Sequence, residues 1–118
     1  MSSRSVEKEE EDRIYVNVLM GDRLKYIRQA INVNQDKMAE KLCINTARLS
    51  TIETGKATRN FSILIRLLLV FQRVDVTFND LVSEKFDRKE IKKRIQEARA
   101  RNRENVVIKA SSVIVKTR

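Results

Sequence analysis

Residues 34–56, NQDKMAEKLCINTARLSTIETGK, predict two short helices joined by a tight turn. Asn34 is a typical helix N-cap, and Gly55 near the end can adopt the left-handed conformation that terminates a helix. Small Ala39 allows two crossing helices to approach closely, and Ile44 can fill the corner between them. The apolar residues at helical spacing are Met38, Leu42, Leu49 and Ile52. The pattern predicts a helix-turn-helix.

This stretch resembles the helix-turn-helix of the phage lambda repressor and Cro class, the XRE family, and the resemblance extends from about Gly21 to Leu81. The shared features are Gln35 opening the first motif helix, Ala39 at the crossing, Leu49 and Ile52 in the second helix, and Glu53-x-Gly55-Lys56 after it. The resemblance implies a mainly α fold, namely a five-helix lambda-repressor-like DNA-binding domain. It also implies a structural ion pair between Arg28 and Glu53.

Cys43 departs from the family pattern. The family usually has glycine at this turn position, where the backbone tends toward positive φ. A non-glycine residue there costs about 1 kcal/mol. We therefore expect a strained turn within the same fold.

The composition narrows the classes of function. The chain has 118 residues, no histidine and one cysteine, so it lacks the commonest general base and the ligands of a structural zinc site. Gly21 and Gly55 are its only glycines, which excludes a glycine-rich phosphate loop. No apolar run approaches the roughly 20 residues of a membrane span, and no signal peptide is visible. We expect a cytoplasmic, non-enzymatic protein with no catalytic residues, no cofactor and no bound metal.

The net charge of +9 is unevenly distributed. Residues 1–12 carry two basic and five acidic side chains (−3), residues 13–84 carry eleven and seven (+4), and residues 85–118 carry twelve and four (+8). A basic excess favours phosphate backbones in a salt-dependent manner. A merely solvated charged surface is the simpler alternative for the C-terminal part.

The chain divides into three segments on these grounds. Residues 1–12 are polar and acidic, which predicts disorder. Residues 13–84 form the DNA-binding domain, with a short strand at 13–20, or a lead into the first helix, and helices near 22–31, 62–72 and 78–83 beside the motif. The helix at 62–72 is apolar on more than one face, so the helix at 78–83, the 13–20 segment or a second subunit must cover it.

Residues 85–118 form an extension for dimerisation or partner binding. Residues 87–104 predict a basic helix with a sparse apolar stripe of Ile91, Ile95 and Ala98. Residues 105–117 contain two β-branched runs, which favour one or two short β-strands. An unpaired strand promotes aggregation, so a two-fold mate, residues 13–20 or a second protein should cover it.

The second motif helix supplies the candidate base contacts. Its outward N-terminal residues enter the major groove in a helix-turn-helix, and here they are Asn45, Thr46, Ala47, Arg48 and Thr51. Arg48 can bind a guanine bidentately, or a phosphate instead. Thr46, Thr51 and Ala47 can place methyl groups against thymine. Asn45 more often caps a helix than reads a base, and a solvated helix face is the alternative for all five.

Different residues are expected to contact the phosphates. Asn34, Gln35 and the free amides at the start of the first motif helix suit a phosphate, helped by the helix dipole. Lys56, Arg59 and Asn60 resemble the loop that clamps the phosphate strand in the family. Alternatively, Lys56 and Arg59 are ordinary exposed charged residues that do not contact DNA. Arg99, Arg101 and Arg103 can add phosphate contacts or bind an acidic partner.

Together these features predict a sequence-specific regulator that binds double-stranded DNA, namely an autoregulating repressor acting as a homodimer on a two-fold operator. One alternative is the antitoxin of a type II toxin–antitoxin pair, whose residues 85–118 bind the toxin. A second alternative is a protein–protein adaptor without specific DNA binding.

Overall fold

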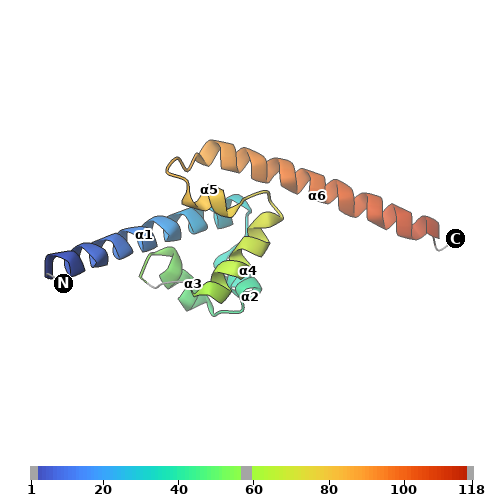
Figure 1. Ribbon diagram of the computed structural model, residues 1–118. Coiled ribbons are helices and arrows are strands. Elements are labelled where there is room, and N and C mark those ends of the chain that lie inside the picture. The colour runs from blue at the N-terminus through green and yellow to red at the C-terminus, as the bar shows by residue number, and fades with distance from the viewer. Residues whose placement is uncertain (1–2, 57–59, 117–118) are drawn as a thin grey trace.

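The computed structural model describes the backbone of residues 3–56 and 60–116 and the side chains of residues 6–56 and 60–103. This part of the chain contains six helices and no strand (Figure 1). The helices are α1 (Ser3–Ala30), α2 (Gln35–Leu42), α3 (Thr46–Glu53), α4 (Phe61–Gln72), α5 (Phe78–Val82) and α6 (Arg88–Lys116). The N-terminal half of α1 and the C-terminal half of α6 project from the central helices in opposite directions (Figure 1).

Three asparagines determine where the central helices begin. The side-chain oxygen of Asn34 accepts a hydrogen bond from the backbone N–H of Lys37 at 2.8 Å. Asn45 caps α3 in the same way, and Asn60 caps α4 by accepting from Ile63 N–H at 2.9 Å. Each cap satisfies an amide that the first helical turn leaves without a partner.

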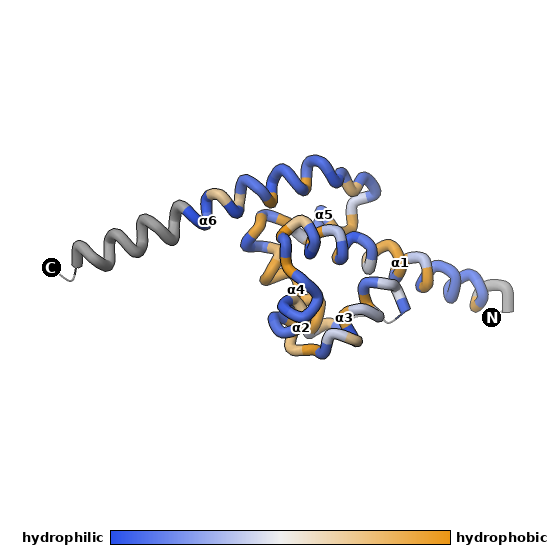
Figure 2. The backbone as a smooth tube through the Cα atoms, turned by 180° about the vertical axis from the view of Figure 1, so that it is seen from behind, coloured by the Kyte–Doolittle hydropathy of each residue, from blue (hydrophilic) through white to orange (hydrophobic). Residues whose placement is uncertain are grey.

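One hydrophobic core joins all six helices. The buried apolar side chains are Met20, Leu24, Ile27, Met38, Ala39, Leu42, Leu49, Ile52, Ile63, Leu67, Phe71, Val74, Val76, Leu81, Ile91, Ile95 and Ala98. The sparse stripe of α6 is therefore buried, as its spacing predicts. Up to Arg103, the other residues of α6 are polar except Ala100, and this part of the tube is mostly blue (Figure 2).

Polar contacts attach α6 to the domain. Arg94 forms an ion pair with Asp80 at 2.8 Å, and Arg101 forms one with Asp75. The hydrogen bond from Arg94 lowers the pKa of the Asp80 carboxyl, and Thr77 contributes through its backbone and its hydroxyl. Asn102 donates a hydrogen bond to the carbonyl of Arg73 at 3.0 Å. The first half of α6 is thus held along the domain.

The N-terminal predictions differ from the structure. Residues 3–12 are helical rather than disordered. Residues 13–20 continue the same helix, so the predicted strand is wrong and the alternative, a lead into the first helix, is confirmed. Glutamate, lysine and arginine are good helix formers, and a helix already nucleated by its packed half extends at little cost. The partial alternation of residues 14–18 also fits a helix, since Ile14 and Val18 are four residues apart.

The predicted C-terminal strands are also wrong. Residues 105–116 are the continuation of α6, which ends at Lys116. β-Branched residues disfavour a helix by only a few tenths of a kcal/mol each, and neither glycine nor proline interrupts this segment. Local preference therefore did not outweigh the propagation of a helix that begins at Arg88.

Large apolar side chains on the outer face of α4 remain exposed in the described part of the chain. Ile63, Leu67 and Phe71 are buried, whereas Phe61 and Leu69 on the opposite side are exposed. Of the three covers considered from the sequence, α5 packs beside this helix but leaves that face open, and residues 13–20 lie in α1.

Candidate nucleic-acid interface

α2 and α3 are joined by a turn that contains a left-handed residue. Cys43 has φ 59° and ψ 40°, which confirms the positive φ expected where the family has glycine. The N–H of Cys43 and the N–H of Ile44 donate to the carbonyls of Glu40 and Ala39, at 3.2 and 3.1 Å. Ile44 packs against the hydrophobic core, so it fills the corner between the two helices.

α3 has one face in the core and one toward solvent. Leu49 and Ile52 are buried on the inner face, and Glu53 is buried at the end of the helix. Ala47 and Arg48 are exposed, and Thr46 and Thr51 are half-buried. Buried apolar side chains therefore hold the helix in place, and the side chains of its outer face remain free to contact a ligand.

The predicted base-contacting residues differ in how they are engaged. Asn45 caps α3 by accepting from the N–H of Arg48 at 2.7 Å. The hydroxyl of Thr46 donates to Asp36 of α2 at 2.7 Å, and the hydroxyl of Thr51 donates to the carbonyl of Arg48 at 2.7 Å. No ion pair or hydrogen bond holds the guanidinium of Arg48 among the described residues. Ala47 and Arg48 are thus the two side chains most available to a ligand.

The N-terminus of α2 lies beside α3. Gln35, named above as a phosphate contact, donates from Nε2 to Oε1 of Glu53 at 3.0 Å. Asn34 is exposed, and its side chain caps the helix. A glutamine amide has two donor hydrogens, so the contact with Glu53 leaves one for another acceptor.

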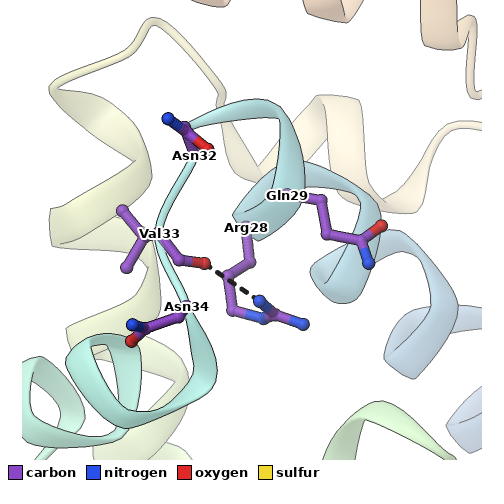
Figure 3. A pocket seen from close by; sticks show the side chains of 5 residues that line it. All are labelled: Arg28, Gln29, Asn32, Val33 and Asn34. Carbon is purple, nitrogen blue, oxygen red and sulfur yellow. Dashed lines mark hydrogen bonds between the residues drawn. The ribbon is translucent and has the colours of Figure 1, made fainter.

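Glu53 also binds Arg28, the residue that the resemblance pairs with it. Arg28 donates from Nε to Oε2 of Glu53 at 2.6 Å and from Nη2 to Oε1 at 3.1 Å. Both residues are buried, with 7% and 5% of their surfaces exposed. The third nitrogen of the guanidinium donates to the carbonyl of Val33 at 2.9 Å (Figure 3). The pair ties α1 to α3 and to the link that precedes α2.

An open polar depression lies at the same corner. It encloses about 460 Å³ and is lined by Arg28, Gln29, Asn32, Val33 and Asn34 (Figure 3). Asn34 marks the start of α2, so the depression borders the amides at that helix N-terminus. Polar groups and a helix N-terminus together suit an anionic oxygen more than an apolar ligand.

The segment after α3 turns sharply at Gly55. Gly55 has φ 79°, and the N–H of Lys56 donates to the carbonyl of Thr51 at 2.9 Å, which closes the helix. A Cβ at Gly55 would lie 2.7 Å from the Cα of Val18 in α1. Lys56 and Asn60 are exposed on either side of residues 57–59, and Arg59 lies outside the described residues.

Three structural contributions were missed from the sequence. A Cβ on Gly21 would lie 2.5 Å from the carbonyl oxygen of Ile52, so glycine permits α1 to cross the end of α3. Arg66 of α4 donates to the carbonyl of Leu42 at 3.0 Å, and Asp36 accepts from Thr46. A glycine inside a helical pattern often has a packing reason, so Gly21 carried a usable signal. The other two had none.

The described residues contain no cluster of three or more histidine, cysteine or carboxylate side chains that could hold a metal ion. In the same part of the chain, none of the helices combines the length and the apolar character that crossing a membrane requires.

Comparison with known proteins gave one finding. Residues 24–79 match the family model described as Helix-turn-helix, which covers all of α2, α3 and α4. Neither the curated proteins nor the solved structures gave a match. The match includes Gln35, Ala39, Leu49, Ile52 and the segment Glu53-x-Gly55-Lys56, which are the features that carried the resemblance to the XRE family. The part of this chain between residues 24 and 79 is therefore an XRE-family helix-turn-helix domain.

Proposed function

We propose that this protein is a sequence-specific DNA-binding transcriptional regulator, acting as a repressor of its own gene and binding a two-fold operator as a dimer. One observation carries the proposal. α3 is fixed in the core by Leu49 and Ile52, while on its outer face the side chains of Ala47 and Arg48 are exposed and the Arg48 guanidinium has no hydrogen bond or ion pair among the described residues. A rigid helix with an unoccupied outer face suits insertion into the major groove.

The side chains of α3 can make different kinds of contact with the bases. Arg48 has five donors and can bind O6 and N7 of a guanine together. Ala47 can contact a thymine methyl. Thr46 and Thr51 donate their hydroxyl hydrogens within the protein, so toward DNA they can offer only an accepting oxygen or a methyl group. Asn45 caps the helix and contributes least.

The start of α2 and the segment after α3 are the proposed phosphate contacts. Asn34, which precedes α2, lines the polar depression, and with the N-terminal amides of α2 and the second hydrogen of Gln35 it suits one phosphate. Lys56 and Asn60 are exposed next to the end of α3 and suit a phosphate on the other side of the groove. Arg59 is proposed for the same strand on the resemblance alone.

Fluorescence anisotropy with duplex DNA from upstream of the protein's own gene tests the proposal. The titration includes excess non-specific competitor and compares wild type with Arg48→Ala and with Lys89→Ala. Lys89 is an exposed cation of α6, so the second variant removes the same charge away from α3. We expect Arg48→Ala to weaken binding by roughly 5- to 150-fold, since a lost base contact costs about 1–3 kcal/mol, and Lys89→Ala to have a much smaller effect.

The opposite result is equally clear. If wild type and both variants bind with similar weak affinity, and all lose binding together as salt rises, α3 does not read sequence. The protein would then be the adaptor considered from the sequence.

The antitoxin function is a second candidate, because α6 continues for fourteen residues beyond Asn102, the last of its residues with a described contact to the domain. A projecting helix of this length suits a partner protein. Co-expression with the product of the adjacent reading frame, followed by removal of residues after Arg103, tests it. A complex that survives the truncation would exclude this role for the projecting part of α6.

A further inference from the structure

Large apolar side chains are exposed in two regions of the described chain. Five lie within residues 6–18 of α1, and the other five lie on α4 and α5. They are Val6, Ile14, Tyr15, Val16 and Val18, and Phe61, Ile65, Leu69, Phe78 and Val82. Clustering of such residues marks interaction surfaces, whereas single exposed apolar residues are ordinary.

The first surface is the outer face of α4. Phe61, Ile65 and Leu69 are spaced by four residues and have exposed fractions of 77%, 39% and 59%. A crevice of about 230 Å³ borders this stripe near the C-terminal end of the helix. It is lined by Lys41, Arg66, Leu69, Val70 and Arg73, with three cations and no acidic residue. We call the stripe together with Lys41, Arg66 and Arg73 the α4 outer face.

The second surface is residues 6–18 of α1, which we call the α1 arm. Glu7, Glu11, Ile14 and Val18 follow the spacing i, i+4, i+7 and i+11, which places them along one side of a helix. Ile14 and Val18 are about half exposed, and neither Glu7 nor Glu11 forms an ion pair among the described residues. The side is acidic toward the N-terminus and apolar toward the domain.

One copy of the chain does not bring these surfaces together. The α1 arm runs away from α4 in both views (Figures 1 and 2). An acidic and apolar helix is therefore exposed on one part of the molecule, and a basic and apolar helix face is exposed on another. In a pair of copies, the acidic and apolar helix of one copy can cover the basic and apolar face of the other.

The two surfaces match in register when the helices are antiparallel. Val18 then lies opposite Phe61, Ile14 opposite Ile65, Glu11 beside Leu69, and Glu7 beside Arg73. From Glu7 to Val18 the arm is about 17 Å long, and from Phe61 to Arg73 the face is about 18 Å long at 1.5 Å per residue. Apolar residues meet apolar residues, and the acidic end meets the cations.

We propose that the α1 arm of one copy docks antiparallel on the α4 outer face of a second copy, and that the exchange is reciprocal, so that both copies of a two-fold dimer contribute an arm and a face. The area favours this arrangement over direct stacking of two α4 stripes. At about 200 Å² for a large side chain and the exposed fractions given above, one stripe offers only about 350 Å², whereas a stable interface needs about 800 Å² per partner. Reciprocal exchange uses two surfaces on each copy.

The docking of the α1 arm rests on the dimer of the proposed function. Its test needs no DNA, so the dimer interface and the DNA-binding function can be refuted separately. Sedimentation equilibrium on the full chain compares wild type with the face reversal Lys41→Glu/Arg73→Glu, the arm reversal Glu7→Lys/Glu11→Lys, and the combination of the two. Lys89→Glu/Lys93→Glu is the matched control, because it makes the same charge change on exposed residues of α6. Arg66 stays unchanged because it caps α2.

We expect a wild-type dimer, at least a tenfold rise in dissociation constant for each reversal alone, recovery to within about threefold in the combination, and no change in the control. A wild-type chain that remains monomeric at 100 µM, or a dimer that neither reversal weakens, would overturn the proposal. A dimer weakened by the face reversal but not rescued by the combination would show that another segment occupies the face.

Disulfide formation gives a second measurement that does not depend on charge. Ile14→Cys/Ile65→Cys in a Cys43→Ser background should form a covalent dimer under mild oxidation, because these two positions face each other in the proposed register. Ile14→Cys/Val82→Cys is the control, and it should remain monomeric on a denaturing gel. Equal cross-linking of the two variants would exclude the register.

Discussion

Replacing Gly21 by alanine should destabilise the domain, although alanine is the better helix former. Alanine is favoured over glycine in a helix interior by up to about 1 kcal/mol. Against this, the new Cβ would lie 2.5 Å from the carbonyl oxygen of Ile52, 2.7 Å from that of Glu53 and 3.0 Å from its carbonyl carbon. All three are backbone atoms of the last turn of α3, so no side chain can rotate away.

Inserting a carbon into packed surroundings costs about 1–3 kcal/mol. The upper half of that range applies here, because Ile52 is buried in the core and Glu53 is held by Arg28. After the gain in helix propensity is subtracted, Gly21→Ala should lower the free energy of unfolding by about 1–2 kcal/mol. Part of the strain can be relieved by a shift of α3, which would also weaken operator binding.

Urea unfolding followed by circular dichroism measures the effect, and the anisotropy assay measures the consequence for binding. Lys25→Ala, one turn further along the exposed side of α1, is the control and should change stability by less than about 0.5 kcal/mol. If Gly21→Ala is as stable as wild type or more stable, α1 and α3 do not approach as closely as the structure has them.

Three further outcomes follow from the same contacts. Glu53→Gln leaves the Arg28 guanidinium buried without its counter-charge and should cost about 3–5 kcal/mol in urea unfolding; a loss below about 1 kcal/mol would mean that water reaches the pair. Cys43→Gly removes a non-glycine residue from positive φ and should raise stability by up to about 1 kcal/mol, unless the turn is unstrained. Arg94 lowers the pKa of Asp80 in the folded state, so the stabilisation is complete above the unfolded pKa of roughly 4 and is lost as pH falls through the folded value. The urea midpoint should therefore decrease less between pH 6 and pH 3 for Asp80→Asn than for wild type.

The central part of the fold was predictable because its signals agree with one another. Asn34 and Asn45 are capping residues in front of apolar residues at helical spacing, and Gly55 ends the second helix. Each of these signals depends on the residue itself and its neighbours within one helical turn, so the sequence contains it in full. The buried stripe of α6 was predictable for the same reason, since Ile91, Ile95 and Ala98 share one side of a helix.

The two projecting helical segments were not predictable on local grounds. In residues 14–18 and 105–116, helix and strand preferences differ by a few tenths of a kcal/mol per residue. Such a small difference is outweighed by the continuity of a helix whose other half is packed. Whether these segments form helix or strand therefore depends on contacts between residues far apart in the sequence, such as that between Tyr26 and the carbonyl of Arg88.

The sequence predicts which residues belong to the candidate site but not the hydrogen bonds that they form. The motif predicts that Thr46 and Gln35 lie near DNA, and the structure shows that Thr46 donates to Asp36 and Gln35 to Glu53. These partners are ten and eighteen residues away in the sequence, and several other polar residues are as close along the chain. Only the crossing of α2 and α3 selects among them.

The contacts of Glu53 separate the residues that hold the fold from those on the outer face of α3. Its carboxylate accepts from Arg28 of α1 and from Gln35 of α2, so the last residue of α3 fixes both neighbouring helices. The outer side of the same helix carries Ala47 and Arg48, which add nothing to the core. A substitution at Arg48 therefore alters what α3 can contact at almost no cost in stability, whereas one at Glu53 moves three helices at once. If α3 reads DNA as proposed, its specificity can change through Ala47 and Arg48 alone, because Glu53, Leu49 and Ile52, which orient the helix, are different residues.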